Sequence, residues 1–176
     1  MRLLLHTCCA PCSVQCIEQL GHEGITPTLF WYNPTIHPVT EYRSRRDAFI
    51  GYAQSIGMEY ILQDEYGLRT FIEDIYPNFD QRCAVCYRSR LERTALYATQ
   101  NGYDVISTTL LISPYQNHEL ICEIAHQLAD QYNVEFLYRD FRPGFRAGQS
   151  AARALGLYMQ KYCGCIFSEE ERYLKR

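Results

Sequence analysis

Cysteine residues dominate the chemistry open to this 176-residue chain, which contains nine of them. Seven lie in three short motifs, a C-C-x-x-C, a C-x-x-C and a C-x-C, formed by Cys8, Cys9 and Cys12, by Cys83 and Cys86, and by Cys163 and Cys165. Clustered cysteines in a reducing compartment usually bind metal or carry out redox reactions. The apolar run at the start of the chain, LLL, is too short for a secretory signal, so we expect a cytoplasmic protein with a metal or redox centre.

The number of clustered sulfurs bears on which metal is bound. Seven thiolates exceed the four ligands of a tetrahedral zinc, so the surplus favours an iron–sulfur cluster with sulfurs left over for a second task. The C-x-C pair is short enough to close a strained, easily reduced disulfide that suits electron delivery. A zinc-stapled domain with spare thiols stays open as the alternative. Cys16 and Cys122, outside the motifs, are predicted to be buried structural thiols.

Short apolar runs alternate with helical patterns along the chain. Strands are predicted at 3–5, 26–32, 59–62, 105–109 and 134–137, and helices at 13–20, 39–56, 68–75, 83–101, 117–132, from about 149, and at 169–174. This alternation predicts a single α/β domain over residues 1–176, a three-layer sandwich around a mostly parallel, doubly wound sheet of about five strands.

Polar and thiol side chains follow the predicted strands at their carboxyl ends, where ligands of open parallel sheets bind. His6 and the first cysteine motif follow the first strand, Thr108 ends the fourth, and Asp140 follows the fifth. The C-x-x-C motif falls at the start of a helix, where the helix dipole stabilises thiolates. The sequence therefore predicts a site at this edge of the sheet.

Charge and composition exclude several classes of protein. No apolar run approaches the ~20 residues of a membrane span, so we expect no membrane association. The net charge of −3 argues against a protein that coats nucleic acid, yet fifteen of the 17 basic residues are arginine and 15 residues are tyrosine. Arginines and tyrosines beside the cysteine motifs suit a base extruded from single-stranded RNA, and ordinary surface ion pairs are the alternative.

Taken in order, the motifs LLLHTCCAPCS, YNPTIHP, RCAVCYRSRLERTA, STTLLISPYQN, RDFR and QKYCGCIFS resemble the cobalamin-independent epoxyqueuosine reductases of the QueH family. The resemblance covers residues 3–168. It implies an oxidoreductase of tRNA processing that reduces the epoxide of epoxyqueuosine in the anticodon loop to give queuosine, the last step of queuosine biosynthesis. It also implies a fold similar to that of the ATP-pyrophosphatase (HUP) enzymes.

The resemblance also implies which residues act. Carried over by position, a [4Fe-4S] cluster would be bound by Cys8, Cys9, Cys83 and Cys86. Cys163 and Cys165 match a redox-active pair that closes a disulfide bond, and Cys12 lies where a ligand to an adjacent mononuclear iron could come from. The partners implied are the modified tRNA and an electron donor that the sequence does not identify. Asp140, His6 and Tyr115 are, by position, the candidates for the proton donor.

Two functions other than epoxide reduction fit parts of this sequence. ATP-dependent tRNA-modifying enzymes of the same fold carry a glycine-rich S-G-G-x-D-S loop after the first strand, whereas residues 8–13 here contain no glycine that would let backbone N–H groups approach a phosphate. ATP chemistry is therefore disfavoured. The second rival is a non-catalytic zinc module that binds RNA.

Overall fold

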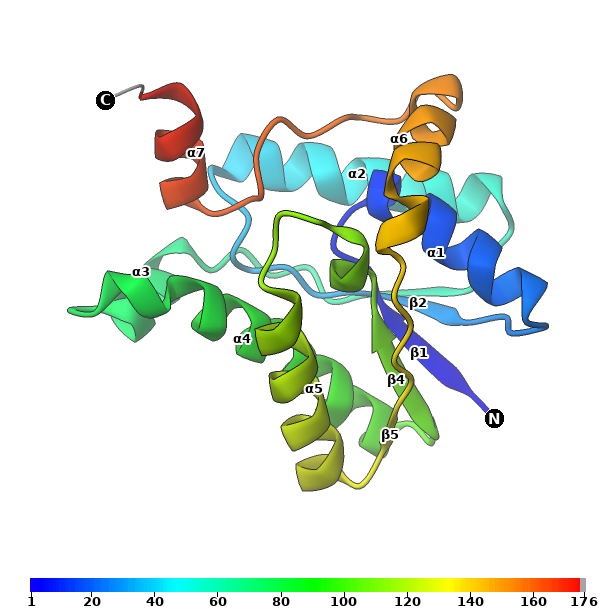
Figure 1. Ribbon diagram of the computed structural model, residues 1–176. Coiled ribbons are helices and arrows are strands. Elements are labelled where there is room, and N and C mark those ends of the chain that lie inside the picture. Colours follow the sequence, from blue (N-terminus) through cyan, green and yellow to red (C-terminus); the bar gives the residue numbers. More distant parts are fainter. Residues whose placement is uncertain (175–176) are drawn as a thin grey trace.

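A five-stranded parallel sheet forms the centre of the protein in a computed structural model, which describes residues 1–174 (Figure 1). The strands are β1 (Leu3–His6), β2 (Thr28–Trp31), β3 (Tyr60–Leu62), β4 (Val105–Thr108) and β5 (Glu135–Phe136). Their order across the sheet is β3-β2-β1-β4-β5, and every neighbouring pair is parallel. The predicted doubly wound parallel sheet of five strands is confirmed.

The three central strands, β1, β2 and β4, are buried because both of their faces are covered. β1, β2 and β4 are buried along their whole length, as expected for parallel strands between two layers of helices. β5 has only two residues, one buried and one exposed, because it closes one edge of the sheet.

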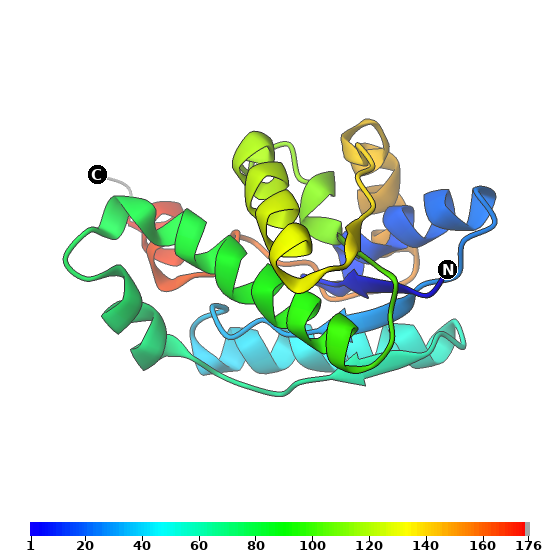
Figure 2. The same cartoon turned by 90° about the horizontal axis from the view of Figure 1, so that it is seen from below.

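Helices cover both faces of the sheet (Figures 1 and 2). One layer contains α1 (Ala10–His22), α2 (Val39–Ser55) and α6 (Phe145–Ala154). The opposite layer contains α4 (Arg82–Gln100) and α5 (His118–Tyr132), with α3 (Leu68–Ile75) packed against α4. Short 3₁₀ turns, η1 (Phe79–Gln81), η2 (Thr109–Ile112) and η3 (Arg142–Gly144), join these elements, and α7 (Ile166–Tyr173) follows the last cysteine motif.

The start of α1 differs from the prediction. The helix was predicted over residues 13–20, but it begins at Ala10, with Cys9 as the N-cap. The Cys9 sulfur accepts a hydrogen bond from the backbone N–H of Cys12, and Pro11 stands in the first turn, where the missing N–H of proline costs nothing. The Ser13 hydroxyl donates instead to the Ala10 carbonyl. A thiol therefore does the capping usually done by a hydroxyl.

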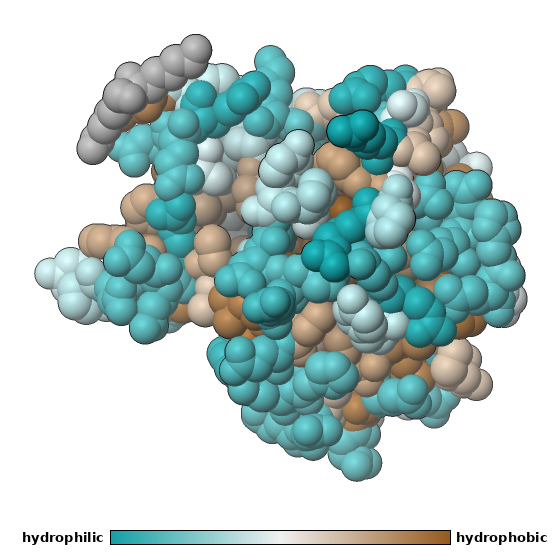
Figure 3. Space-filling view, viewed as in Figure 1, coloured by the Kyte–Doolittle hydropathy of each residue, from teal (hydrophilic) through white to brown (hydrophobic). Residues whose placement is uncertain are grey.

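The register of the sheet brings the strand ends together at one edge. His6, the last residue of β1, is level with Phe30 of β2 and Thr108 of β4. The loops that follow these strands therefore leave the sheet side by side. Within residues 1–174 no helix combines the length and apolar character that a membrane crossing needs. Figure 3 shows hydrophilic residues over most of one face of the molecule.

Candidate metal and redox centre

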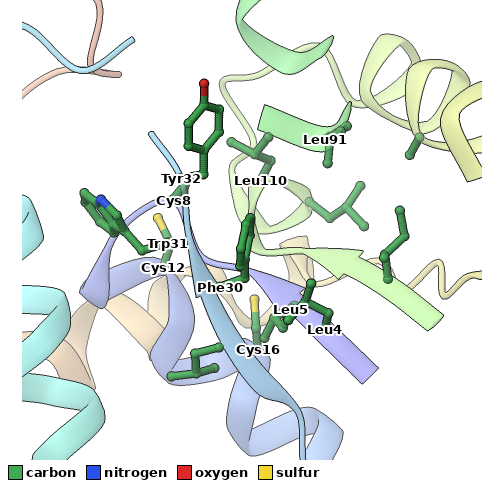
Figure 4. Packing of buried hydrophobic residues seen from close by; sticks show 14 of the residues in the cluster. Leu4, Leu5, Cys8, Cys12, Cys16, Phe30, Trp31, Tyr32, Leu91 and Leu110 are labelled. Atoms are coloured by element: carbon green, nitrogen blue, oxygen red, sulfur yellow. The ribbon is translucent and has the colours of Figure 1, made fainter. Parts of the chain in front are cut away.

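Three cysteine sulfurs meet where β1 runs into α1. The ligand atoms of Cys8, Cys9 and Cys12 all lie within 4.8 Å of one another, and all three side chains are buried. Figure 4 shows Cys8 and Cys12 near the end of β1, with Cys16 deeper in the core beside Phe30. Sequence spacing alone predicts this trio, because a turn into a helix brings residues 8, 9 and 12 to one end.

The trio is held by hydrogen bonds from other elements. Thr109, the first residue after β4, accepts from the Cys8 backbone N–H at 3.0 Å and donates to the Cys8 sulfur at 3.2 Å. The Gln160 amide donates to the Cys9 sulfur at 2.9 Å and to the Cys12 sulfur at 3.7 Å. Donors that point at sulfur are typical of the surroundings of metal-bound thiolates.

The three thiols of Cys8, Cys9 and Cys12 differ in how readily they ionise. Hydrogen bonds from the Cys12 and Cys9 thiols lower the pKa of Cys8 well below its usual value. Burial raises the pKa of Cys9, and the bond to Cys8 raises that of Cys12. Without a cation, only one of these thiols ionises readily. A bound metal would remove this conflict, because its charge favours all three thiolates.

The second motif lies at the start of α4, as predicted. Cys83 and Cys86 occupy the first turns of the helix, with Cys83 exposed and Cys86 half-buried. Burial and the nearby sulfurs of Cys86 and Cys165 raise the pKa of Cys83. The Cys86 sulfur lies 3.0 Å from the hydroxyl of Thr35. This motif thus borders both the C-x-C motif and the loop after β2.

The C-x-C motif is held in place by hydrogen bonds from α2 and from the loop after β2. Arg45 of α2 donates to the carbonyls of Tyr162 and Cys163 at 2.9 and 2.7 Å. The His37 backbone N–H donates to the Gly164 carbonyl at 2.8 Å, and its Nδ1 accepts from the Ile166 N–H at 3.2 Å. His37 therefore binds the segment that carries the C-x-C motif. Burial lowers its pKa to about 4, so the ring is neutral.

Gly164 has a backbone conformation that only glycine adopts easily. Its φ is +155°, and a Cβ built there would lie 3.3 Å from Arg45 Nη1. Gly164→Ala should therefore lower the free energy of unfolding by about 1–3 kcal/mol, measured by urea denaturation. Gly51→Ala is the control, because Gly51 lies in α2 with nothing within 4 Å of its Cβ position. That control should be neutral or slightly stabilising. Equal stability of the two variants would contradict the strain argument.

Each cysteine motif lies at the start of a helix. Cys9 caps α1, Cys83 lies in the first turn of α4, and Cys165 occupies the N-cap position of α7 without a capping hydrogen bond. Each helix N-terminus carries a partial positive charge and unpaired N–H groups, which stabilise anions. These positions therefore favour the thiolate form of the cysteines.

His6 is a structural residue of the site. It is fully buried, with Nδ1 2.9 Å from the Thr108 hydroxyl and Nε2 3.2 Å from the Asn33 side-chain oxygen. Burial lowers its pKa to about 4, so the ring is neutral at pH 7 and both of its nitrogens are engaged. His6 joins β1, β2 and β4 at their ends, and this geometry gives no support to its predicted role as a proton donor.

Asp140 and Tyr115 make their side-chain contacts with Arg142 and Phe145 rather than with the three cysteine motifs. Asp140 binds the Arg142 guanidinium through both carboxylate oxygens at 2.8 Å. These bonds lower the pKa of Asp140 to about 2, which leaves it ionised and a poor proton donor at neutral pH. The Tyr115 side chain is 86% exposed, with its ring edge-on to Phe145. The geometry therefore supports neither of these predicted donors directly.

Sequence reasoning missed Arg45, Thr35 and the contacts of Gln160. Arg45 forms an ion pair with Glu41 one turn earlier in α2, a spacing typical of exposed helix faces, yet its side chain is only 3% exposed. Gln160 lies three residues before Cys163, and this closeness to the C-x-C motif was a usable signal. Cys16 is fully buried, as predicted, whereas Cys122 is only half-buried.

Comparison with known proteins gives a consistent result. The model of the family described as "Epoxyqueuosine reductase QueH" matches residues 3–171. Proteins named epoxyqueuosine reductase QueH are similar over nearly the whole chain: that of Dehalococcoides mccartyi is 37% identical over 99% of this chain and 96% of its own length. Those of Acinetobacter baylyi and Thermotoga maritima are 38% and 35% identical, over 95% and 97% of this chain and 80% and 91% of their own lengths.

Solved structures confirm the fold class. A protein described as a predicted subunit of a tRNA methyltransferase from Methanocaldococcus jannaschii superimposes with a TM-score of 0.58, at 14% identity, over 87% of this chain and 74% of that one. At this identity the likeness concerns the fold alone. The family match spans all three cysteine motifs and the strand ends that carry the site. The chain therefore belongs to the QueH family of epoxyqueuosine reductases.

Proposed function

We propose that this protein reduces the epoxide of epoxyqueuosine in the anticodon loop of a tRNA, using a [4Fe-4S] cluster bound by Cys8, Cys9, Cys83 and Cys86. The observation that carries the proposal is the buried group of Cys8, Cys9 and Cys12 at the start of α1, together with the interaction of Arg90 with sulfurs from all three cysteine motifs. Within residues 1–174 the ligand atoms that lie within 4.8 Å of one another are those of Cys8, Cys9 and Cys12, so binding by Cys83 and Cys86 is part of the proposal. Family membership supports the same activity. The net reaction takes two electrons and two protons, breaks both C–O bonds of the epoxide, forms the alkene and releases water.

The residues present fit a sulfur-ligated metal group. Three buried sulfurs lie within 4.8 Å of one another. If all three were thiolates they would repel one another unless a cation were bound between them. The Gln160 Nε2 group is directed at two of these sulfurs, while its Oε1 is buried without a hydrogen-bond partner. We propose Cys12 as a ligand to an adjacent iron. Such a group would supply electrons one at a time and act as a Lewis acid.

The chain's own residues position the reaction. Cys83 and Cys163 are exposed and open to a large substrate, whereas Cys8, Cys9 and Cys12 are buried. Oxidation of the Cys163 and Cys165 thiols to a disulfide releases two electrons and two protons, the amount that one turnover consumes. An external reductant would then restore the dithiol. Asp140 stays a candidate acid only for a complex in which substrate separates it from Arg142.

A non-catalytic zinc module is the rival that the cysteine count leaves open. Zinc protein is colourless, whereas anaerobically purified iron–sulfur protein is brown, so absorbance separates the two. The surplus of seven clustered sulfurs over the four that zinc needs favours iron.

The decisive experiment follows the substrate itself. Anaerobically reconstituted protein is mixed with tRNA that carries epoxyqueuosine and with excess dithionite, and the tRNA is digested to nucleosides. Mass spectrometry should show conversion to queuosine by loss of one oxygen atom. Zinc-loaded protein serves as the matched control and should leave the nucleoside unchanged. A brown, reduced protein that leaves epoxyqueuosine intact would refute the proposed activity.

A further inference from the structure

Arg90 is a buried cation with no carboxylate to balance it. It lies on α4, one turn after Cys86, and is 4% exposed. Among residues 1–174 it forms no ion pair with an acidic side chain, and its hydrogen bonds go from Nε and Nη2 to the Thr35 hydroxyl, at 3.2 and 2.9 Å. Arg45, the other buried arginine here, is paired with Glu41 at 2.7 Å. Of these two buried arginines, Arg90 is the one whose charge must be balanced by a group other than a carboxylate.

Sulfur atoms surround this guanidinium. Burial by itself would lower the pKa of Arg90, but nearby cysteines outweigh that effect and raise it; these are Cys86, Cys163, Cys8 and Cys165. A Cβ at Gly164 would lie 3.9 Å from Arg90 Nη2, so the guanidinium lies beside the C-x-C backbone. Arg90 is therefore central to all three cysteine motifs.

Thr35 links the arginine to one of the sulfurs. Its hydroxyl oxygen accepts two N–H bonds from Arg90, which can only donate. The hydroxyl hydrogen is then free to donate to the Cys86 sulfur, 3.0 Å away. Arg90 thus orients the Thr35 hydroxyl so that it donates to the Cys86 sulfur, and the positive charge of Arg90 lies one hydrogen bond further away.

A buried arginine keeps its proton, and burying it unpaired is costly unless negative charge lies close by. We propose that Arg90 is a positioning residue whose fixed charge sets the reduction potential of the sulfur-ligated centre, favouring its reduced, more negative state. This inference rests on the proposed function in that a redox group is bound there. In the poorly solvated interior such a charge acts more strongly than one at the surface.

The test is a redox titration of the reconstituted protein, followed by absorbance and by electron paramagnetic resonance. In Arg90→Gln the one-electron equilibrium should shift at least tenfold toward the oxidised state, which is about 59 mV to lower potential. Arg90→Lys keeps a cation and should stay close to the wild-type value. Arg2→Gln removes the same charge at the opposite end of β1 and should leave the potential unchanged.

Each outcome is informative. An unchanged potential in Arg90→Gln, or an equal shift in Arg90→Lys, would overturn the inference, while a wild-type protein that binds no redox group would instead refute the proposed function. If Arg90→Gln loads poorly, Arg90→Met is compared with wild type in the cluster-free state. Its melting temperature should be no lower, because an unbalanced cation has been removed. A large drop would show that Arg90 serves packing alone.

Discussion

Replacing Cys83 by alanine should abolish the brown absorbance of the reconstituted protein and reduce epoxide loss to background. A [4Fe-4S] cluster is typically held by four cysteine thiolates, of which Cys83 would be one, and because Cys83 is exposed, solvent would reach the position that its thiolate leaves. The loss should exceed the roughly 10–100-fold that removal of an outer partner costs. Iron content, the visible spectrum and mass spectrometry of the tRNA nucleosides measure the three consequences.

Cys122→Ala is the matched control for Cys83→Ala. Cys122 is also a partly accessible thiol on a helix, but its charged neighbours are Arg142 and Asp140 rather than the clustered cysteines. Its loss should leave both the absorbance and the activity intact. Full activity of Cys83→Ala, or loss of the cluster from Cys122→Ala, would end the assignment of Cys83 as a ligand.

Replacing Cys163 by serine should separate electron delivery from metal binding. The cluster absorbance should persist, and with excess dithionite as the direct electron source the variant should still complete a first turnover. The multiple-turnover rate should fall about tenfold or more, because a serine cannot take part in thiol–disulfide exchange. Rapid mixing with one equivalent of tRNA measures the first turnover, and mixing with excess tRNA measures the multiple-turnover rate.

Cys165→Ser provides the comparison for Cys163→Ser. If the two residues form one dithiol, both variants should show the same defect, because either change prevents the disulfide. Disappearance of the metal from Cys163→Ser would instead identify Cys163 as a ligand. A serine variant with wild-type steady-state turnover would exclude the dithiol from the reaction.

The sheet and the strand ends could be predicted because their signals are local. β1 and β4 begin with apolar residues and end on polar ones, as predicted, and α4 begins within one residue of the predicted start. β5 was predicted as four residues and has two, because an edge strand lacks the second neighbour that extends pairing. Helix α6 begins at Phe145, four residues earlier than expected, since its first turn continues the 3₁₀ turn before it.

The contacts of the charged residues could not be predicted, because they depend on tertiary packing. Asp140 follows β5 as expected, yet it is bound by Arg142, two residues later, instead of facing the cysteines. Arg90 occurs among arginines that suit RNA binding, and nothing in the sequence distinguishes it as the one that is buried. The neutral state of His6 likewise follows from partners on β2 and β4.

The covering of the first cysteine motif has a consequence for how the protein matures. Cys8, Cys9 and Cys12 are synthesised well before the residues that cover them, because α6 packs on α1 and Gln160 donates to two of these sulfurs only after some 150 further residues have been made. During synthesis the nascent chain therefore exposes these three thiols until α6 and Gln160 have followed. Metal loading has an open route over that interval, and chaperones or reductants that guard nascent thiols should determine the yield of intact centre.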